Sequence, residues 1–217
     1  MNKKLTLLYV FVCVIILSGM IFVFQDSSSS ELNPDEVISG HSDAMENVNS
    51  AHINIETKIV NERNVLTRSE EYTKQGDMYL AEYKYDNGNT KTVFENETGS
   101  YRVYENRLEP ESKYSLRKKF FSPPIEKQKI ENATVKSRNN STVLYEIDEP
   151  ASNILQGDDV RGNATGTVRV RNDGLIVFYR IEIDVSNPSQ SQYPNEYELE
   201  YRLTGINETE VSHPNEN

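Results

Sequence analysis

The sequence predicts an α+β protein with an N-terminal transmembrane helix and a long, twisted antiparallel sheet covered by one to three helices. Three observations carry this prediction. An uncharged apolar run stands near the start of the 217-residue chain. A single stretch of helical periodicity follows it, and much of the remaining chain alternates polar and apolar residues with a period of two. Such alternation is typical of antiparallel strands with one buried face.

The apolar run, Leu5–Phe24, contains twenty residues without a charge. At about 1.5 Å per residue, a helix of this length spans roughly 30 Å, the thickness of a bilayer core. Lys3 and Lys4 precede the run, which predicts a cytoplasmic N-terminus and an extracellular C-terminal domain. A cleaved signal peptide is the alternative, with a small-x-small pair at Ser27 and Ser29. Its apolar core would be shorter, about 7–15 residues, so we expect a retained single-pass anchor.

Cys13, the only cysteine, lies inside this run and not at its end. A lipid-accepting cysteine stands at the end of the apolar segment, and palmitoylated cysteines usually lie near the membrane boundary. We therefore interpret Cys13 as a small apolar residue of the membrane helix. With no other cysteine in the chain, no disulfide holds the external domain together.

We expect four segments along the chain: an anchor (1–25), a polar tether (26–32), an extracytoplasmic domain (33–212) and a short tail (213–217). The net charge of the chain is −11. Lys3 and Lys4 are the only charged residues before Asp26, so the part beyond the anchor carries −13. A charge of this sign opposes binding to nucleic acid and to anionic membrane surfaces.

The external domain begins with a predicted helix over 33–49. Asn33 is a plausible N-cap, Pro34 suits the first turn, and Val37, His41 and Met45 share one face. Roughly nine strands are predicted after it, the clearest at 52–60, 77–86, 90–107 (two strands joined by a turn at 96–99), 166–185 (a hairpin turning at Asn172–Gly174) and 196–206.

The middle of the chain has a weaker pattern. The stretch 112–130 is either a short helix ended by Pro123 and Pro124 or a loop, and 149–162 contains a possible helical turn around Ile154. Within the first stretch, "LRKKFF" combines cations with adjacent phenylalanines. Its candidates for contact with lipid headgroups are Lys118, Lys119, Phe120 and Phe121. The alternative is a helix with one buried phenylalanine and a solvated basic face.

Tyrosine is abundant, with thirteen residues and no tryptophan. Apolar residues on the predicted strand faces would line the concave side of a curled sheet. These ligand-pocket candidates are Tyr79, Tyr83, Tyr101, Val103, Val177, Tyr179, Ile181, Tyr197, Leu199 and Tyr201. Apolar side chains with phenol tips suit an acyl or isoprenoid chain. The alternative is that they form a fully packed core beneath the helices.

The order of the parts resembles the half-barrel envelope lipoproteins, which include the LolA and LppX carriers and a group of haloarchaeal surface lipoproteins. The resemblance spans residues 33–214. It lies in the helix followed by "MENVNSAHINIETKI" and, most of all, in "VRVRNDGLIVFYRIEID" followed by "YELEYRLTGINETEVSHP". It implies a half-barrel sheet and a lipid-like ligand. The lipidated cysteine of those proteins has no counterpart here, because Cys13 lies within the apolar run.

No catalytic or metal-binding motif is recognisable. His41, His52 and His213 lack metal-ligand spacing, and no Gly-x-Ser-x-Gly or phosphate-binding loop occurs. Acidic pairs such as Glu70–Glu71 are explained by a solvated face. We therefore expect no enzyme, cofactor or metal site. Asn-x-Ser/Thr acceptors occur at six places: Asn96, Asn132, Asn139, Asn140, Asn163 and Asn207.

The sequence as a whole predicts a membrane-anchored envelope protein that binds a hydrophobic, lipid-like ligand on the outer side. Its expected partners are the membrane, through the N-terminal helix, and an apolar ligand, while no protein partner can be named. The alternative is a non-enzymatic structural or interaction module whose core is fully packed. The volume of the space between sheet and helix distinguishes the two, because ligand pockets exceed about 300 Å³.

Overall fold

The computed structural model describes residues 34–104, 107–111, 115–126, 130, 132–155, 160–187, 193–209 and 211. Residues from Asn33 onward pack as one compact unit. The predicted anchor, tether and C-terminal tail lie outside the described residues, as does Cys13. Within the described ranges, no helix has the length and apolar character needed to cross a membrane.

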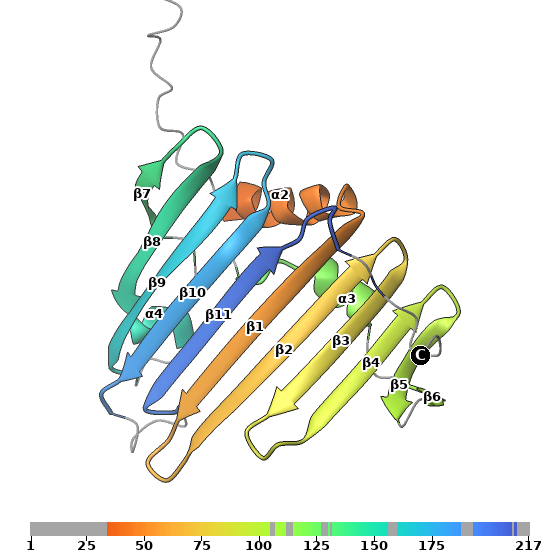
Figure 1. Cartoon of the computed structure of the whole chain (residues 1–217). Helices are drawn as coiled ribbons and strands as arrows, with labels where there is room; N and C mark the ends of the chain where they lie inside the picture. The colour runs from red at the N-terminus through yellow and green to blue at the C-terminus, as the bar shows by residue number, and fades with distance from the viewer. Residues whose placement is uncertain are drawn as a thin grey trace, which may run out of the picture. The chain divides into compact units, whose positions relative to one another are not determined.

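One open antiparallel sheet of eleven strands forms the body of the domain (Figure 1). Its strands are β1 (Ser50–Val60), β2 (Val65–Gln75), β3 (Met78–Tyr85), β4 (Thr90–Asn96), β5 (Gly99–Tyr104), β6 (Arg107–Pro110), β7 (Thr134–Arg138), β8 (Thr142–Pro150), β9 (Gly162–Arg171), β10 (Ile176–Val185) and β11 (Glu196–Thr204). The large antiparallel sheet with few helices is the predicted α+β class, and its open form is consistent with a half-barrel.

The sheet consists of two meanders that meet at its centre. Its spatial order is β6-β5-β4-β3-β2-β1-β11-β10-β9-β8-β7. The chain therefore starts in the middle with β1, runs outward to β6, passes to the opposite edge and returns inward to β11 (Figure 1). β1 and β11 pair along nine residues, from His52–Thr204 to Val60–Glu196. The two halves of the chain thus meet at the central pair of strands.

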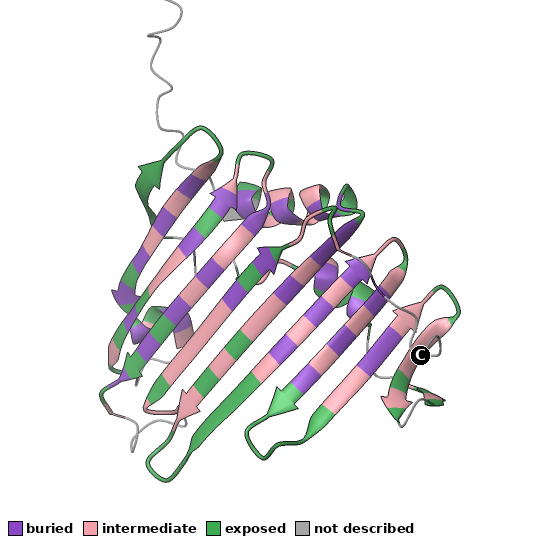
Figure 2. Cartoon of the chain, viewed as in Figure 1, coloured by how far each residue is buried: buried purple, intermediate pink, exposed green. Residues whose placement is uncertain are grey.

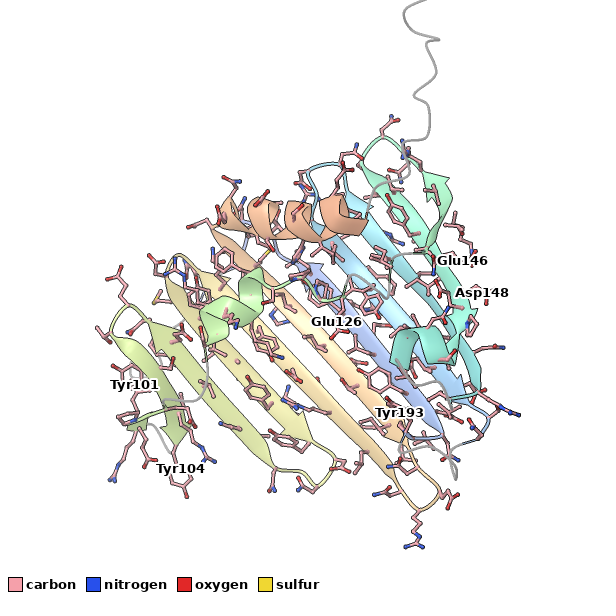
Figure 3. All side chains as sticks on the ribbon, turned by 180° about the vertical axis from the view of Figure 1, so that it is seen from behind. Tyr101, Tyr104, Glu126, Glu146, Asp148 and Tyr193 are labelled. Atoms are coloured by element: carbon pink, nitrogen blue, oxygen red, sulfur yellow. The ribbon has the colours of Figure 1, made fainter. Side chains whose placement is uncertain are left out.

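Three helices lie on one face of the sheet (Figure 3): α2 (Pro34–Glu46), α3 (Leu116–Phe121) and α4 (Ala151–Leu155). On α2, Val37, His41 and Met45 are buried, as the helical stripe predicts. Gly40 of this helix lies against Gly174, the turn residue of the β9–β10 hairpin. Gly174 has φ +91°, and a Cβ there would lie 2.8 Å from the Gly40 oxygen. The close approach explains a glycine within the helix.

Burial alternates along the strands, and it shows where the sheet is uncovered (Figure 2). All five residues of β7 are exposed, and β6 has only one half-buried residue. These two edge strands have no buried face to produce an alternating pattern, and the sheet has eleven strands where roughly nine were predicted. The first four residues of β2 are exposed as well.

The strand register corrects three of the predicted inward-facing residues. Tyr79 pairs with Glu95, and Glu95 pairs with Ser100, so these three residues share the helix-covered face. Tyr101 and Val103 alternate with Ser100 and therefore lie on the opposite face. Figure 3 shows Tyr101 at the outer edge of the sheet.

The third correction concerns Val177. The register between β9 and β10 shifts between Ile176 and Phe178, which is the signature of a β-bulge. Because of this extra residue, Ile176 is fully buried and pairs with Val170, whereas Val177 is only half-buried. The predicted alternation holds from Tyr179 onward, where Ile181 and Ile183 are also buried.

Candidate ligand cavity

A cavity of about 620 Å³ lies between the central strands and α3. This volume falls within the range of about 300–1,000 Å³ that is typical of small-molecule sites. The floor is formed by β2, β1 and β11, and the roof by α3 and the prolines that follow it. The lining residues are Ile53, Ile55, Thr57, Glu70, Tyr72, Ser115, Lys118, Lys119, Phe120, Ser122, Pro123, Pro124, Tyr197, Leu199 and Tyr201.

The floor is apolar because β1 and β11 present matching side chains to the helix-covered face. Ile53 pairs with Leu203, Ile55 with Tyr201, and Thr57 with Leu199. Directly opposed residues of an antiparallel pair project from the same face, so these rows lie side by side. Ile55, Leu199 and Tyr197 remain half-exposed although they are apolar. The centre of the sheet thus offers apolar surface that no helix covers completely.

The wall on the β2 side contains a buried carboxylate. Glu70 is 6% exposed and accepts a hydrogen bond from the hydroxyl of Tyr72. Arg68 Nε lies 3.0 Å and Lys119 Nζ 3.5 Å from its oxygens. Burial, followed by the hydrogen bond to Glu70, raises the pKa of Tyr72 far above its usual value, so this phenol stays protonated. The cluster joins α3 to the sheet.

Several contacts fix α3 above the cavity. Ser115 caps the helix by accepting a hydrogen bond from the Lys118 amide, at 3.2 Å. The Phe120 ring is buried, with its centre 6.5 Å from that of Tyr72 and 5.7 Å from that of Tyr79. The backbone N–H of Leu116 donates to Glu95 Oε2, at 2.5 Å. α3 therefore has a fixed position over β2–β4.

The structure separates the predicted pocket residues into three groups. Tyr197, Leu199 and Tyr201 line the cavity. Tyr79, Tyr83, Tyr179 and Ile181 face the same side of the sheet but are buried in the packed core, each at most 2% exposed. Tyr101 and Val103 lie on the other face, and Val177 lies at the bulge. Some of the predicted residues thus line the cavity, and others belong to the packed core.

Three of the four predicted membrane-contact residues line the same cavity. Lys118, Lys119 and Phe120 line it, and Phe120 is only 1% exposed, so its ring is not available to a membrane surface. Phe121 is half-buried, with Lys74 Nζ 5.7 Å from its ring centre. The arrangement is the alternative expected from the sequence, a helix with one buried phenylalanine and a solvated basic face.

Sequence reasoning missed Glu70 as a site residue. Glu70 and Glu71 were expected on a solvated face, but strand alternation sends them to opposite faces. Glu71 lies on the outer face, where its carboxylate is 2.7 Å from Lys84 Nζ. Glu70 faces inward with Tyr72, from which it is separated by one residue. The E-x-Y spacing within an alternating strand was the available signal.

Three buried phenol groups lie on the same face without a visible partner. The hydroxyls of Tyr145, Tyr179 and Tyr201 make no hydrogen bond within the part of the chain that the structure describes. Burial raises the pKa of all three. An unpaired buried hydroxyl carries a desolvation cost of about 1–3 kcal/mol. Tyr201 also lines the cavity, so a ligand can reach this residue.

The glycosylation candidates are at different degrees of exposure. Asn132, Asn139, Asn140, Asn163 and Asn207 are exposed, while Asn96 is half-buried. Asn207 has φ 62°, and its side-chain oxygen accepts the amide hydrogen of Asn49 at 2.9 Å. Among the described residues, no group of three potential His, Cys, Asp or Glu ligands is placed to hold a metal ion.

Comparisons with known proteins give structural similarity but no family. No family model matches the chain, and neither does any curated protein. Lipoprotein LppX of Mycobacterium tuberculosis shares 14% identity over 83% of this chain and 99% of its own, with a TM-score of 0.44. LprF of Mycobacterium bovis shares 13% over 83% and 96%, with a TM-score of 0.42.

A third similar structure is a LolA superfamily protein of Nitrosomonas europaea. It shares 6% identity over 83% of this chain and 95% of its own, with a TM-score of 0.31. Structures of the LolA and LppX type are thus among those similar to this chain.

Proposed function

We propose that this chain is a non-catalytic binding protein of the cell envelope, which takes up a hydrophobic, lipid-like ligand between the central strands and α3. The observation that carries the proposal is the cavity of about 620 Å³ over an apolar floor. Apolar ligand surface that leaves water contributes about 25 cal/mol per Å² buried. Binding by sequestration therefore needs no reacting group.

The cavity also separates this proposal from the alternative of a fully packed interaction module. A closed core would leave no space above Ile55 and Leu199, whereas both residues are half-exposed and line the cavity. Its volume of about 620 Å³ lies within the range of about 300–1,000 Å³ that is typical of ligand pockets. A binding protein accounts for this space.

Location on the outer side of the membrane forms part of the proposal. The apolar run Leu5–Phe24 would act as an uncleaved anchor with a cytoplasmic N-terminus, and glycans would occupy exposed acceptors such as Asn132 and Asn139. A relationship to haloarchaeal surface lipoproteins is proposed on the pattern of the C-terminal strands. Replacement of Cys13 by alanine should leave membrane association unchanged, and release of the variant into the medium would contradict a proteinaceous anchor.

The binding proposal is tested by organic extraction of the purified full-length chain, followed by mass spectrometry of the extract. Displacement of a fluorescent fatty acid by unlabelled lipids provides a second readout. We expect a copurifying lipid and saturable binding. Recovery of no lipid together with no binding of the probe would overturn the proposal.

A matched pair of variants locates the binding site. Thr57→Trp places a large ring on the cavity floor, and Thr67→Trp places the same ring at an exposed position on the outer face of β2. We expect the first variant to lose about tenfold or more in probe affinity and the second to bind as the wild type does. Equal affinities would show that the probe binds elsewhere.

A further inference from the structure

The charges at the cavity are unevenly distributed. Lys118 and Lys119 line its α3 side, and Glu70 is the carboxylate among the described lining residues. The carboxylate of Glu70 is already engaged by Tyr72, Arg68 and Lys119. Lys118 is exposed and makes no ion pair with any residue that the structure describes. Its ammonium group is thus available to a ligand in the cavity.

The strong acidity of the chain does not cancel this local positive charge. On β1 and β11, the acidic residues alternate with the lining residues and therefore face the opposite side. Glu198 and Glu200 are examples, and both pair with Arg180 on that outer face, at 2.8 Å and 3.8 Å. Exposed charges are largely screened beyond about 8 Å at physiological ionic strength. The nearest charges to a group bound next to α3 are therefore those of Lys118 and Lys119, and they favour an anionic group there.

A second carboxylate, Glu126, lies on the helix-covered side of the sheet outside the lining residues of the cavity. Burial raises the pKa of Tyr197, and the negative charges of Glu126 and then Glu70 raise it further. Glu126 acts on Tyr179 of β10 in the same direction, after burial and Tyr197. This carboxylate consequently lies toward β10 and β11, and Figure 3 shows it over the middle of the sheet on the helix-covered side. The cationic residues that line the cavity, Lys118 and Lys119, thus lie on its α3 side.

We infer that the ligand is an amphiphile with one anionic head group, a carboxylate or phosphate monoester, bound by Lys118 and Lys119 while its chain lies on the floor of Ile53, Ile55 and Leu199. The inference rests on the proposed function and adds the chemistry and orientation of the ligand. The head group contacts water at the exposed lysines, and the chain replaces water over the apolar rows. The polar rim and apolar floor correspond to the two parts of such a molecule.

The test compares ligands that share one chain and differ in the head group. Palmitate, hexadecyl phosphate and the neutral hexadecanol are titrated against the full-length chain in one non-ionic detergent at a fixed concentration. Competition from the detergent is then the same for each ligand. We expect the two anions to bind about tenfold more tightly than the alcohol, with an advantage that shrinks as salt is added.

Charge-removing variants assign the effect to its residue. Lys118→Gln should weaken palmitate binding about three- to tenfold and leave hexadecanol binding unchanged. Lys58→Gln is the matched control, because Lys58 lies on the outer face of β1, 3.8 Å from Glu196, and its replacement changes the total charge equally. The control should bind all three ligands as the wild type does.

The possible failures are distinguishable. Equal affinity for palmitate and hexadecanol would overturn the inference and leave the proposed function intact. Equal losses of palmitate affinity in Lys118→Gln and Lys58→Gln would also overturn the inference. The total charge of the protein, and not a charge at the cavity, would then determine the affinity. Acetate or inorganic phosphate that binds as tightly as the long-chain anions would show an anion site without a chain site. If none of the three amphiphiles binds although a lipid copurifies, the inference is overturned and the proposed function stands. If no lipid copurifies either, the proposed function itself is wrong.

Discussion

The two sides of the helix-covered face bury different kinds of side chain. The α3 side, consisting of β2–β4 with α3, contains inward-facing ionic groups such as Glu70 and Lys74, each 5–6% exposed. The α4 side, consisting of β8–β10 with α4, is almost entirely apolar, with Ile147, Val168 and Ile181 at most 1% exposed. The cavity opens on the α3 side and the central strands.

The two sides differ because aliphatic side chains pack more closely than rings and paired charges do. Aliphatic side chains interdigitate to crystal-like density, and Ile147, Val168 and Ile181 of the α4 side are buried in this way. On the α3 side, rings and paired charges hold α3 at a distance from the floor, with Phe120 over Tyr72 and Lys119 beside Glu70. On the proposed function, the α3 side supplies the binding site, and the apolar α4 side supplies stability.

The largest expected effect comes from Phe120, the aromatic anchor of α3. Phe120→Ala removes a fully buried ring from its contacts with Tyr72 and Tyr79 and should lower the free energy of unfolding by about 3–5 kcal/mol. Phe121→Ala, in the next position but half-buried, should cost about 1 kcal/mol or less through its contact with Lys74. Urea unfolding measures both. Similar losses would show that α3 is not anchored by Phe120.

The second prediction concerns His41, a buried ionisable group that packs on the α4 side. Its Nδ1 accepts the amide hydrogen of Ile176 at 3.1 Å, and burial lowers its pKa from 6.5 to about 4. Between these values the unfolded chain binds a proton that the folded chain does not. Stability is therefore fully present above pH 6.5 and falls by about 3 kcal/mol as the pH drops to 4.

The variant His41→Asn isolates this contribution. Its side-chain oxygen can replace Nδ1 as an acceptor for Ile176, but it does not titrate. The free energy of unfolding should therefore decline less between pH 7 and pH 4 in the variant than in the wild type, because all carboxylates titrate alike in both. Parallel pH curves would mean that His41 is protonated in the folded state.

A third prediction compares two buried glutamates, one on each side. Glu70→Gln removes the charge that pairs with Arg68 and Lys119. It should lower the free energy of unfolding by about 1–3 kcal/mol. Glu149, 8% exposed on the α4 side, accepts one hydrogen bond from Asn153 at 2.8 Å, and Glu149→Gln should cost about 0.5 kcal/mol or less. Thermal unfolding at pH 7 measures the pair. A larger loss for Glu149→Gln would reverse the proposed contrast.

The α4 side was the more predictable of the two. Its strands alternate with a period of two, and the turn at Asn172–Gly174 marks their hairpin, so β9, β10 and the face of Tyr179 follow from the pattern. The bulge at Val177 did not, because one extra residue changes the face locally without changing composition. The strands named from the sequence did not include β2 or β8, nor the edge strands β6 and β7, neither of which has a buried face.

The cavity could be predicted only in part. Tyr197, Leu199 and Tyr201 were recognised because β11 alternates strictly. Glu70 and Lys118 were not, because they come from segments 48 residues apart, which meet only when α3 folds back over β2. Local patterns indicate which face a residue occupies, whereas the position of a short helix across the sheet depends on long-range packing. Phe120 shows this limit, since its neighbour Phe121 has the same side chain and far less burial.

The smallest expected effect concerns the buried phenols. The hydroxyl of Tyr145, on the α4 side, has no hydrogen-bond partner in the described part of the chain, so Tyr145→Phe should be neutral or stabilise by up to about 1 kcal/mol. Tyr72 on the α3 side donates to Glu70, and Tyr72→Phe should destabilise by about 1–3 kcal/mol. Chemical denaturation of the two variants compares the sides directly. Destabilisation by Tyr145→Phe would mean that this hydroxyl has a partner after all, such as an enclosed water, and that the α4 side is not dry.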